Sequence, residues 1–304
     1  MKPNQIVKIQ NSAAMNAKSS FSIAFGGVQI PVIAGPCAIE SKDQLLQTAA
    51  GVKSRGASIL RGGIYKMRTN PNSFQGLGDA AYEFINQVKS EVQMPLISEI
   101  VDPRQISDMM DSVDIFQVGS RNMYNYALLK EIAKTNKPVM LKRGFSATIE
   151  EWINAANYIL LGGNPNVILC ERGIRSFDTT TRNTLDLNAV AYVKAHTQFP
   201  IVVDPSHGTG RTELIAPMAA AAIAAGADGI MVEVHIEPKK SMSDAFQALS
   251  LDQFSEVMKI SRAVASACGR KILEITETAS ENFATDSARH LSNDATKFSD
   301  LVTP

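Results

Sequence analysis

Polar residues that could bind anions or metal ions follow short apolar runs at eight places along the chain. One of these positions combines an arginine with a carboxylate, and two combine a carboxylate with histidine. The residues concerned are Cys37, Arg61 with Lys66 and Arg68, Glu99, Arg121, Lys142 with Arg143, Glu171 with Arg172, Asp204 with His207, and Glu233 with His235. Two chemistries are represented, cations suited to anionic ligands and a mixed set of metal-binding donors.

The cations form the larger group. They are Arg61, Lys66, Arg68, Arg121, Lys142, Arg143, Arg172 and Arg211. If they converge on one cleft, their repulsion destabilises the fold unless an anion offsets it. We therefore expect a substrate with more than one phosphate or carboxylate. For any single residue, an ion pair with Glu99, Asp102, Glu171 or Asp204 is the alternative.

The second group combines a thiol, an imidazole and two carboxylates, namely Cys37, His207, Glu233 and Asp244. Such a set suits one divalent transition metal ion such as Mn²⁺, Fe²⁺, Co²⁺ or Zn²⁺, although the spacing matches no local zinc motif. Cys37 could instead be a small buried apolar residue. On an extended segment His235 would point to the same side as Glu233. It could then support the metal ligands, or it could be a histidine that makes an ordinary hydrogen bond.

The apolar runs themselves predict the elements that position these residues. They read as continuous buried strands, typical of a parallel sheet covered on both faces. The expected strands are Val32–Ala34, Ser58–Arg61, Leu96–Glu99, Ile115–Val118, Val139–Lys142, Val167–Cys170, Ile201–Val203 and Gly229–Val234. Segments of helical period alternate with them, and Ser41 to Gln44 and Thr148 to Glu151 fit capping boxes.

Eight strands alternating with helices predict a closed TIM (β/α)8 barrel, in which the strand-end residues converge on one face. We expect three parts. Residues 1–31 form an N-terminal extension, with a β-hairpin over 21–30 around Gly26 and Gly27 that covers the barrel bottom. Residues 32–268 form the catalytic barrel, and residues 269–304 a C-terminal helix or loose tail.

Composition excludes several classes of protein. The 30 basic and 30 acidic residues balance, which argues against a nucleic-acid partner. The longest apolar run, Ile215 to Ala225, is too short to cross a bilayer. Three cysteines without a pairing pattern predict no disulfide framework. No apolar secretory segment stands at the start, so we expect a cytoplasmic protein without a membrane partner.

Taken together, these motifs resemble a known enzyme family. The matching stretches are IAGPCAIES (33–41), LRGGIYKMRTNPNSFQGLG (60–78), SEIVDP (98–103), QVGSRNM (117–123), LKRG (141–144), CERGIR (170–175), DPSHGTGR (204–211) and MVEVH (231–235) followed by Ser243-Asp244. In this order they resemble the 3-deoxy-D-arabino-heptulosonate 7-phosphate (DAHP) synthases. The branch is class I beta, which is related to the 3-deoxy-D-manno-octulosonate 8-phosphate (KDO8P) synthases.

The resemblance implies a TIM-barrel transferase that condenses phosphoenolpyruvate with erythrose 4-phosphate, the first step of the shikimate pathway. It implies one divalent metal ion, a homo-oligomer (dimer or tetramer) and roles for individual residues. The metal ligands would be Cys37, His207, Glu233 and Asp244. Phosphoenolpyruvate would be bound by Arg61, Lys66, Arg121, Lys142 and Arg172, and the phosphate of the aldose by Arg68 and Thr69. The candidates for proton transfer would be Lys66, Glu99 and His207.

Two departures from the family pattern concern the aldose. Met67 replaces the usual proline of Lys-Pro-Arg-Thr, which frees the backbone φ angle there, and Ser120 replaces alanine of Gly-Ala-Arg. Two alternatives therefore stay open. One is the same chemistry on another aldose phosphate, as in a KDO8P synthase or an enzyme of specialised metabolism. The other is a binding subunit without activity. We also expect no fused feedback domain.

Overall fold

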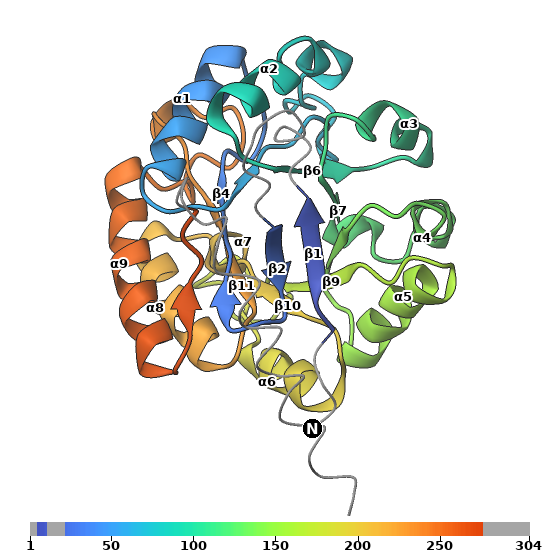
Figure 1. Ribbon diagram of the computed structural model, residues 1–304, viewed down its shortest axis with the longest axis vertical. Helices are drawn as coiled ribbons and strands as arrows, with labels where there is room; N and C mark the ends of the chain where they lie inside the picture. The colour runs from blue at the N-terminus through green and yellow to red at the C-terminus, as the bar shows by residue number, and fades with distance from the viewer. Residues whose placement is uncertain (1–4, 11–21, 276–304) are drawn as a thin grey trace, which may run out of the picture.

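A closed barrel of eight parallel strands forms the centre of the computed structural model, which describes residues 5–10 and 22–275 (Figure 1). Around the barrel the order is β10-β11-β4-β5-β6-β7-β8-β9. The strands are β4 (Val32–Gly35), β5 (Ile59–Arg61), β6 (Leu96–Ile100), β7 (Ile115–Val118), β8 (Val139–Lys142), β9 (Val167–Glu171), β10 (Ile201–Val203) and β11 (Gly229–Glu233). Each predicted strand is present, with both ends within one residue of the prediction. The TIM barrel is confirmed.

Helices surround the barrel in Figure 1 and cover the outward faces of its strands. The α-helices are α1 (Lys42–Lys53), α2 (Tyr82–Val92), α3 (Ile106–Met109), α4 (Tyr126–Ala133), α5 (Ile149–Leu161), α6 (Leu187–His196), α7 (Pro205–Thr209), α8 (Thr212–Ala224) and α9 (Leu251–Ala267). Short 3-10 turns are η2 (Gly78–Ala81), η3 (Pro103–Gln105), η4 (Ser120–Asn122) and η5 (Pro238–Lys240).

The two predicted capping boxes differ in the structure. Thr148 and Glu151 form the complete box at the start of α5. Ser41 accepts a hydrogen bond from the Gln44 amide at the start of α1, but the Gln44 side chain accepts from the Glu40 amide instead of returning to Ser41. Both arrangements satisfy amides that the first helical turn leaves without partners.

Side chains alternate along each barrel strand between the interior and the helix layer. One level of the interior is apolar and holds Ile33, Ile59, Ile97, Ile115, Met140, Ile168, Val202 and Met231. Two residues further along the same strands come Gly35, Arg61, Glu99, Gln117, Lys142, Cys170, Asp204 and Glu233. The period of two therefore places the polar strand-end residues above a sealed apolar layer, at the carboxyl end of the barrel.

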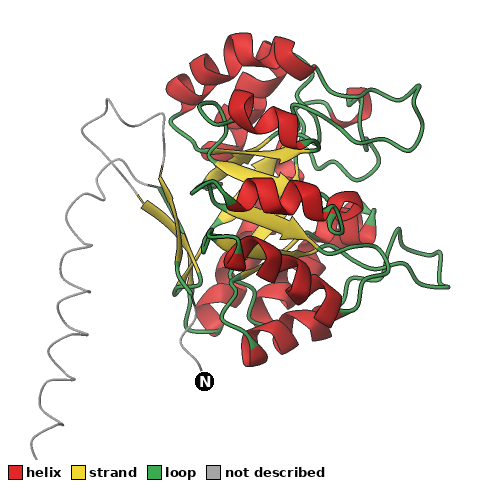
Figure 2. Ribbon diagram, turned by 90° about the vertical axis from the view of Figure 1, so that its right-hand side faces the viewer, coloured by secondary structure: helices red, strands yellow, loops and turns green. Residues whose placement is uncertain are grey.

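The N-terminal extension covers the opposite end. There β1 (Val7–Gln10) pairs antiparallel with β2 (Ser22–Phe25), and Figure 2 shows this pair across the end of the barrel away from the long loops. Val7, Ile9, Ile23 and Phe25 are buried against the apolar interior layer. The extension thus covers the barrel bottom as expected.

The strand pairing within residues 21–30 was predicted wrongly. β2 pairs with β1, and β3 (Gln29–Ile30) pairs in parallel with β12 (Lys271–Ile272), so no hairpin folds around Gly26 and Gly27. Gly26 has φ 98°, and a β-carbon there would lie 2.3 Å from the backbone oxygen of Gln5. Glycine is needed at this point for a close backbone approach and not for a hairpin turn.

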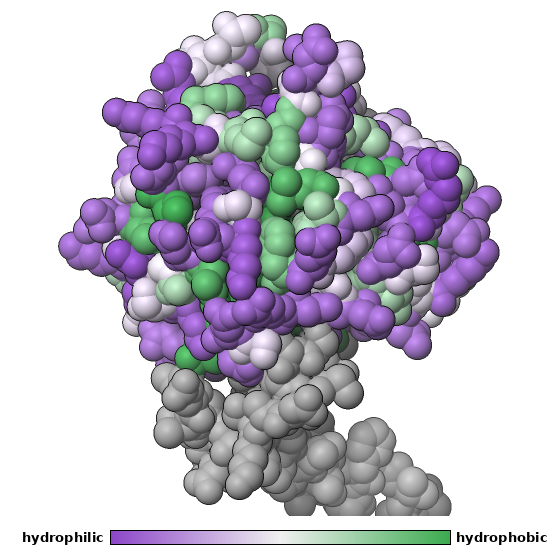
Figure 3. All heavy atoms as spheres, turned by 90° about the horizontal axis from the view of Figure 1, so that it is seen from above, coloured by the Kyte–Doolittle hydropathy of each residue, from purple (hydrophilic) through white to green (hydrophobic). Residues whose placement is uncertain are grey.

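Strand β12 also differs from the helix or loose tail predicted over 269–304. The rest of that prediction concerns residues from 276 onward, which lie outside the described part of the chain. The division of the chain into three parts, with boundaries after residues 31 and 268, stays a prediction. Within the described residues, no helix combines the length and apolar character needed to cross a membrane. On the face in Figure 3, hydrophilic residues predominate, and the hydrophobic ones gather near the centre and in smaller separate patches around it.

Candidate metal centre and anion-binding cleft

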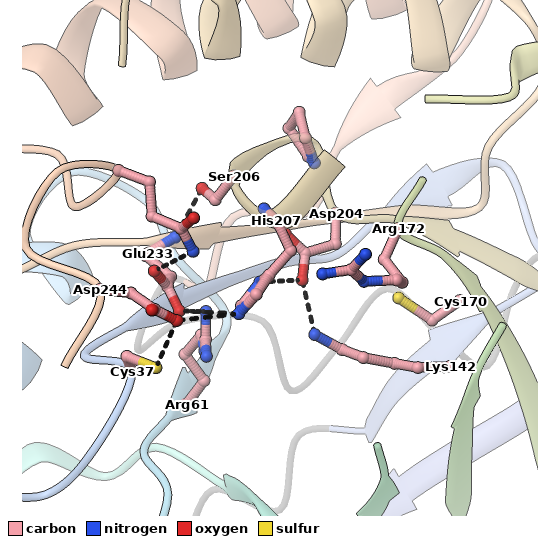
Figure 4. Close-up of polar contacts among 12 residues, drawn as sticks. Cys37, Arg61, Lys142, Cys170, Arg172, Asp204, Ser206, His207, Glu233 and Asp244 are labelled. Carbon is pink, nitrogen blue, oxygen red and sulfur yellow. Dashed lines mark hydrogen bonds and ion pairs between the residues drawn. The ribbon is translucent and has the colours of Figure 1, made fainter. Parts of the chain in front are cut away.

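Four predicted donors from distant parts of the chain meet at the carboxyl end of the barrel. Cys37, His207, Glu233 and Asp244 each offer one ligand atom, and these atoms all lie within 4.8 Å of one another. His207 Nε2 is 3.1 Å from Glu233 Oε1 and 3.8 Å from Asp244 Oδ2. Cys37 Sγ lies 3.5 Å from Asp244 Oδ2. Figure 4 shows the four side chains pointing toward one another.

Different elements deliver the four side chains. Cys37 follows β4, Glu233 is the last residue of β11, and His207 lies in the short helix α7 after β10. Asp244 stands in the connection between β11 and α9 with a left-handed φ of 53°. Few non-glycine residues adopt this conformation, although aspartate is among those that tolerate it. The loop therefore holds Asp244 in a defined and unusual position.

Asp204 fixes the imidazole of His207. Asp204 Oδ2 accepts from His207 Nδ1 at 2.7 Å and from Lys142 Nζ at 2.6 Å. The Nδ1 proton thus lies on the side of Asp204, which leaves the Nε2 lone pair directed at the other donors. Burial lowers the pKa of His207 even though Asp204 and Glu233 act in the opposite direction, and a lower pKa favours the neutral ring that metal binding needs.

The two carboxylate oxygens of Glu233 have different surroundings. Its Oε2 accepts from Gln247 Nε2 at 2.6 Å. Its Oε1 is buried, and within the described residues it has no hydrogen-bond partner of good geometry, although Arg61 Nη1 lies 3.0 Å away. Buried carboxylate oxygens are normally paired. A metal ion placed among the four donors would give Glu233 Oε1 a bonding partner. The residues present therefore fit a divalent metal ion.

The thiol of Cys37 is protonated in the metal-free protein. Burial, together with the Glu233 carboxylate, raises the pKa of Cys37 to about 12. Ser243 Oγ donates to its sulfur at 3.2 Å, and the thiol faces Asp244. Metal binding must therefore displace this proton to generate the thiolate ligand.

A cleft opens beside the four donors. Every substrate-binding and catalytic residue predicted from the sequence lines it. They are Arg61, Lys66, Arg68, Thr69, Glu99, Arg121, Lys142, Arg172 and His207. The predicted residues thus come together on one surface, with Met67 and Ser120 also in the lining.

Only half of the six predicted cations in this cleft have a carboxylate partner. Arg61 pairs with Glu233, Lys66 with Glu99 and Lys142 with Asp204. The other three, Arg68, Arg121 and Arg172, form no ion pair with any residue in the described ranges 5–10 and 22–275. Unpaired cations in a partly closed cleft favour an anionic ligand.

Arg172 shows the clearest need for such a ligand. It is 2 % exposed, and burial, reinforced by the neighbouring Arg182, lowers its pKa to about 10. The guanidinium groups of Arg121, Arg172 and Arg175 lie 5.3, 4.7 and 5.1 Å from the centre of the Phe145 ring. This aromatic face orients the arginines while leaving their donors available.

Two cations in the predicted group do not belong to the cleft. Arg143 follows inward-facing Lys142, so alternation turns it to the helix side, where its Nη1 contacts Glu171 at 3.1 Å and Asp186 at 2.9 Å. Arg211 is exposed and lies 3.6 Å from Glu213. For Arg143 the structure thus selects the ion-pair alternative, and the period of two could have indicated this.

Glu99 stands opposite Lys66, with 3.4 Å between Oε2 and Nζ. The glutamate fits because Gly119 has no side chain, since a β-carbon there would lie 2.0 Å from Glu99 Oε1. A glycine at the end of β7 is therefore required for the carboxylate at the end of β6 to reach the cleft.

The sequence analysis missed two polar residues at the site. Gln247 is fully buried and joins Glu233 to Arg182, whose Nη1 donates to its Oε1 at 2.7 Å. Arg182 lines the cleft and lies 3.5 Å from Asp244 Oδ2. Both come from long connections with no strand-end position or motif to single them out.

Comparisons with known proteins agree with this geometry. The pattern of the DAHP synthetase I family matches residues 7–269. The chain is 44 % identical over 250 residues to a phospho-2-dehydro-3-deoxyheptonate aldolase of Thermotoga maritima, covering 82 % of this chain and 74 % of that protein. It is 29 % identical over 257 residues to a 2-dehydro-3-deoxyphosphooctonate aldolase of a Bradyrhizobium species, covering 78 % and 89 %.

Solved structures give the same result. The crystal structure of the Thermotoga maritima phospho-2-dehydro-3-deoxyheptonate aldolase (DAHP synthase) superposes with a TM-score of 0.80 at 43 % identity, covering 83 % of this chain and 74 % of that one. A truncated form of the Thermotoga maritima 3-deoxy-D-arabino-heptulosonate 7-phosphate synthase superposes with a TM-score of 0.77 at 40 % identity, covering 83 % and 92 %. These identities are high enough to compare the sites as well as the folds.

Proposed function

The chain belongs to the DAHP synthetase I family, and from this premise we propose that it condenses phosphoenolpyruvate with erythrose 4-phosphate to give DAHP and phosphate. The observation that carries the proposal is the meeting of Cys37, His207, Glu233 and Asp244 beside a cleft with three unpaired arginines. A site that only bound anions would have no use for the four donors.

We assign the four donors to one divalent metal ion. When bound there, the ion would act as a Lewis acid that makes the aldehyde carbon of the aldose electrophilic. Glu233 would bind through Oε1, because Gln247 occupies its other oxygen. His207 would bind through Nε2, because Asp204 holds Nδ1.

The cations are assigned to the two substrates. Arg121, Lys142 and Arg172 would hold the phosphate and carboxylate of phosphoenolpyruvate. Arg61 and Lys66 would contact the same substrate from the side of the cleft next to the four metal-binding donors. Arg68 and Thr69 would hold the phosphate of the aldose. Fixing both substrates in this way places C3 of phosphoenolpyruvate against the aldehyde carbon, which removes much of the entropic barrier.

The reaction also needs a group that moves protons. C3 bonds to the aldehyde carbon, whose oxygen becomes an alkoxide, and C2 is left with cationic character. Phosphate finally leaves C2 together with the proton of the C2 hydroxyl, as the ketone forms. Between these steps, water adds to C2 and one of its protons passes to the alkoxide. Lys66 and Glu99, which form an ion pair in the cleft, are our candidates for taking and returning this proton. His207 was predicted as a third candidate, but both of its nitrogens are engaged, by Asp204 and by the other donors.

The proposal is tested by measuring phosphate release from phosphoenolpyruvate with erythrose 4-phosphate. Treatment with a chelator is expected to abolish turnover, and added Mn²⁺ to restore it. Full activity after verified metal removal would refute the metal-dependent mechanism.

A panel of aldose phosphates of different length distinguishes the proposed reaction from the same condensation with a longer aldose phosphate. Relatives named 2-dehydro-3-deoxyphosphooctonate aldolase, together with Met67 in the cleft, keep another aldose as the second candidate. Preference for erythrose 4-phosphate supports the first function, and preference for a longer aldose phosphate supports the second. Activity with none of them would favour a binding subunit.

A further inference from the structure

Glu40 connects two loops that each carry one of the four donors. It lies between Cys37 and Ser41, the residue that caps α1. Its Oε1 accepts from the Met242 amide at 2.8 Å, in the connection that leads to Asp244. Ser241 Oγ lies 3.1 Å from the same oxygen and 2.8 Å from the Ser243 carbonyl oxygen, so its one proton is shared between these two acceptors. A single carboxylate oxygen thus joins the loop after β4 to the loop after β11.

The other oxygen of Glu40 faces His235. His235 Nε2 lies 3.4 Å from Glu40 Oε2. Because His235 Nδ1 accepts from the Glu237 amide at 2.9 Å, the neutral ring carries its proton on Nε2. Among the described residues that nitrogen is buried without a hydrogen bond of good geometry, and Glu40 Oε2 is the carboxylate oxygen that faces it. His235 therefore supports Glu40 and does not join the donor cluster.

The segment held by Glu40 also contacts Cys37 directly. Ser243 Oγ donates to Cys37 Sγ and accepts from Arg68, and Asp244 follows directly in its left-handed conformation. The side chains of Glu40 and His235 are 11 % and 4 % exposed, so water competes weakly for these contacts. The distance of 3.5 Å between Cys37 Sγ and Asp244 Oδ2 depends on how the two loops are joined.

We propose that Glu40 is a positioning residue that holds Cys37 and Asp244 together as metal ligands before the ion arrives. The inference rests on the metal site proposed above and adds a residue outside it. Outer partners that orient metal ligands typically change metal affinity about 10- to 100-fold when they are removed. We expect a loss of that size from Glu40→Ala.

The experiment titrates the full-length, metal-free protein with Co²⁺ and follows the near-ultraviolet absorption of a cobalt–thiolate bond. Glu40→Ala is expected to raise the Kd for Co²⁺ about 10- to 100-fold. Glu40→Gln keeps an acceptor oxygen for Met242 and Ser241 and is expected to retain most of the affinity. The matched control is Glu237→Ala, which removes the same charge from an exposed glutamate in the same connection between β11 and α9, where the side chain pairs with Lys240 and not with the loop after β4. Circular dichroism checks that every variant is folded.

Three results would overturn the inference: unchanged Co²⁺ affinity in Glu40→Ala, an equal loss in Glu237→Ala, or an equal loss in Glu40→Gln. Should Glu40→Ala not fold, Glu40→Asp shortens the side chain, draws the carboxylate away from the Met242 amide and must still weaken Co²⁺ binding. If the wild-type protein gives no cobalt–thiolate absorption, the metal site itself is refuted. If it does and Glu40→Ala matches it, only the role of Glu40 is refuted.

Discussion

Arg143 and Arg172 are buried arginines at the ends of neighbouring strands, yet their surroundings give them opposite roles. Arg143 is held between Glu171 and Asp186, whereas Arg172 faces the cleft, where it lies over the Phe145 ring and donates to the carbonyl of Gly173 but pairs with no carboxylate of the described residues. A buried ion pair that loses one partner leaves an uncompensated charge, while an unpaired cation is costly until an anion arrives. Stability and ligand binding are therefore assigned to different arginines.

Replacement of Arg143 and Arg172 should separate these roles. Arg143→Ala is expected to lower the free energy of unfolding by about 3–5 kcal/mol, because Glu171 stays buried without its partner. Arg172→Ala should leave stability nearly unchanged but raise the KM for phosphoenolpyruvate. Denaturant unfolding and steady-state kinetics measure both variants. Weakened stability in Arg172→Ala with an unaltered KM would contradict the assignment.

The three cysteines allow a similar comparison. Cys37→Ala is expected to abolish metal-dependent turnover and lower the bound metal, because one of the four donors is lost. Cys268→Ala is the matched control, since this exposed thiol at the end of α9 is remote from the donors. Metal content and phosphate release are measured on both. A Cys37→Ala protein that keeps full metal content would exclude the sulfur as a ligand.

At the scale of elements, alternation along each strand decides which residues reach the cleft. Lys142 faces inward and Arg143 outward, and on the next strand Cys170 faces inward and Glu171 outward. The strands can do this only while the helices outside hold the barrel closed. α9, which packs against α8 and runs on toward β12, is one of these supports.

The start of α9 depends on a local cap. Ser250 accepts from the Gln253 amide, and the Gln253 side chain accepts from the Ser250 amide. Ser250→Ala is expected to cost about 1 kcal/mol of stability, because it leaves a helix amide without a partner. Ser266→Ala, at an exposed position within the same helix, should be neutral or slightly stabilising. Equal effects of the two changes in denaturant unfolding would rule out the cap.

At the scale of the whole molecule, the two ends of the barrel differ. The cleft opens at the carboxyl end of the strands, and the paired strands β1 and β2 close the opposite end. The apolar interior layer separates the cleft from the paired strands β1 and β2. Figure 2 shows the two ends on opposite sides of the barrel. Changes at the closed end should therefore alter stability without altering the site.

Phe25 tests this division, since it is fully buried under the barrel and lies close to Gly229. Phe25→Ala is expected to lower the free energy of unfolding by about 3–5 kcal/mol through lost burial and a cavity. The kcat of the folded enzyme should stay the same. Phe177→Ala, at a side chain that is 99 % exposed, is the control for stability. A large fall in kcat for folded Phe25→Ala would show that the two ends are coupled.

The sequence by itself determined the barrel and which strand-end residues lie at the cleft, but not every residue that surrounds it. Buried parallel strands appear as apolar runs, and inward-facing side chains repeat every second residue, so Arg61, Glu99 and Lys142 could be placed at the cleft before any coordinates. These patterns are local. They depend only on neighbouring positions along the chain.

Only the tertiary structure decided which groups pair and which stay free. Glu40 reaches Met242, and Gln247 joins Glu233 to Arg182, through contacts between loops far apart in sequence. β2 pairs with β1 and not with β3. In this pairing Ile23 and Phe25 are buried against the apolar layer at the bottom of the barrel. Such choices depend on distances across the folded barrel, and those distances are set by the packing of all its elements at once.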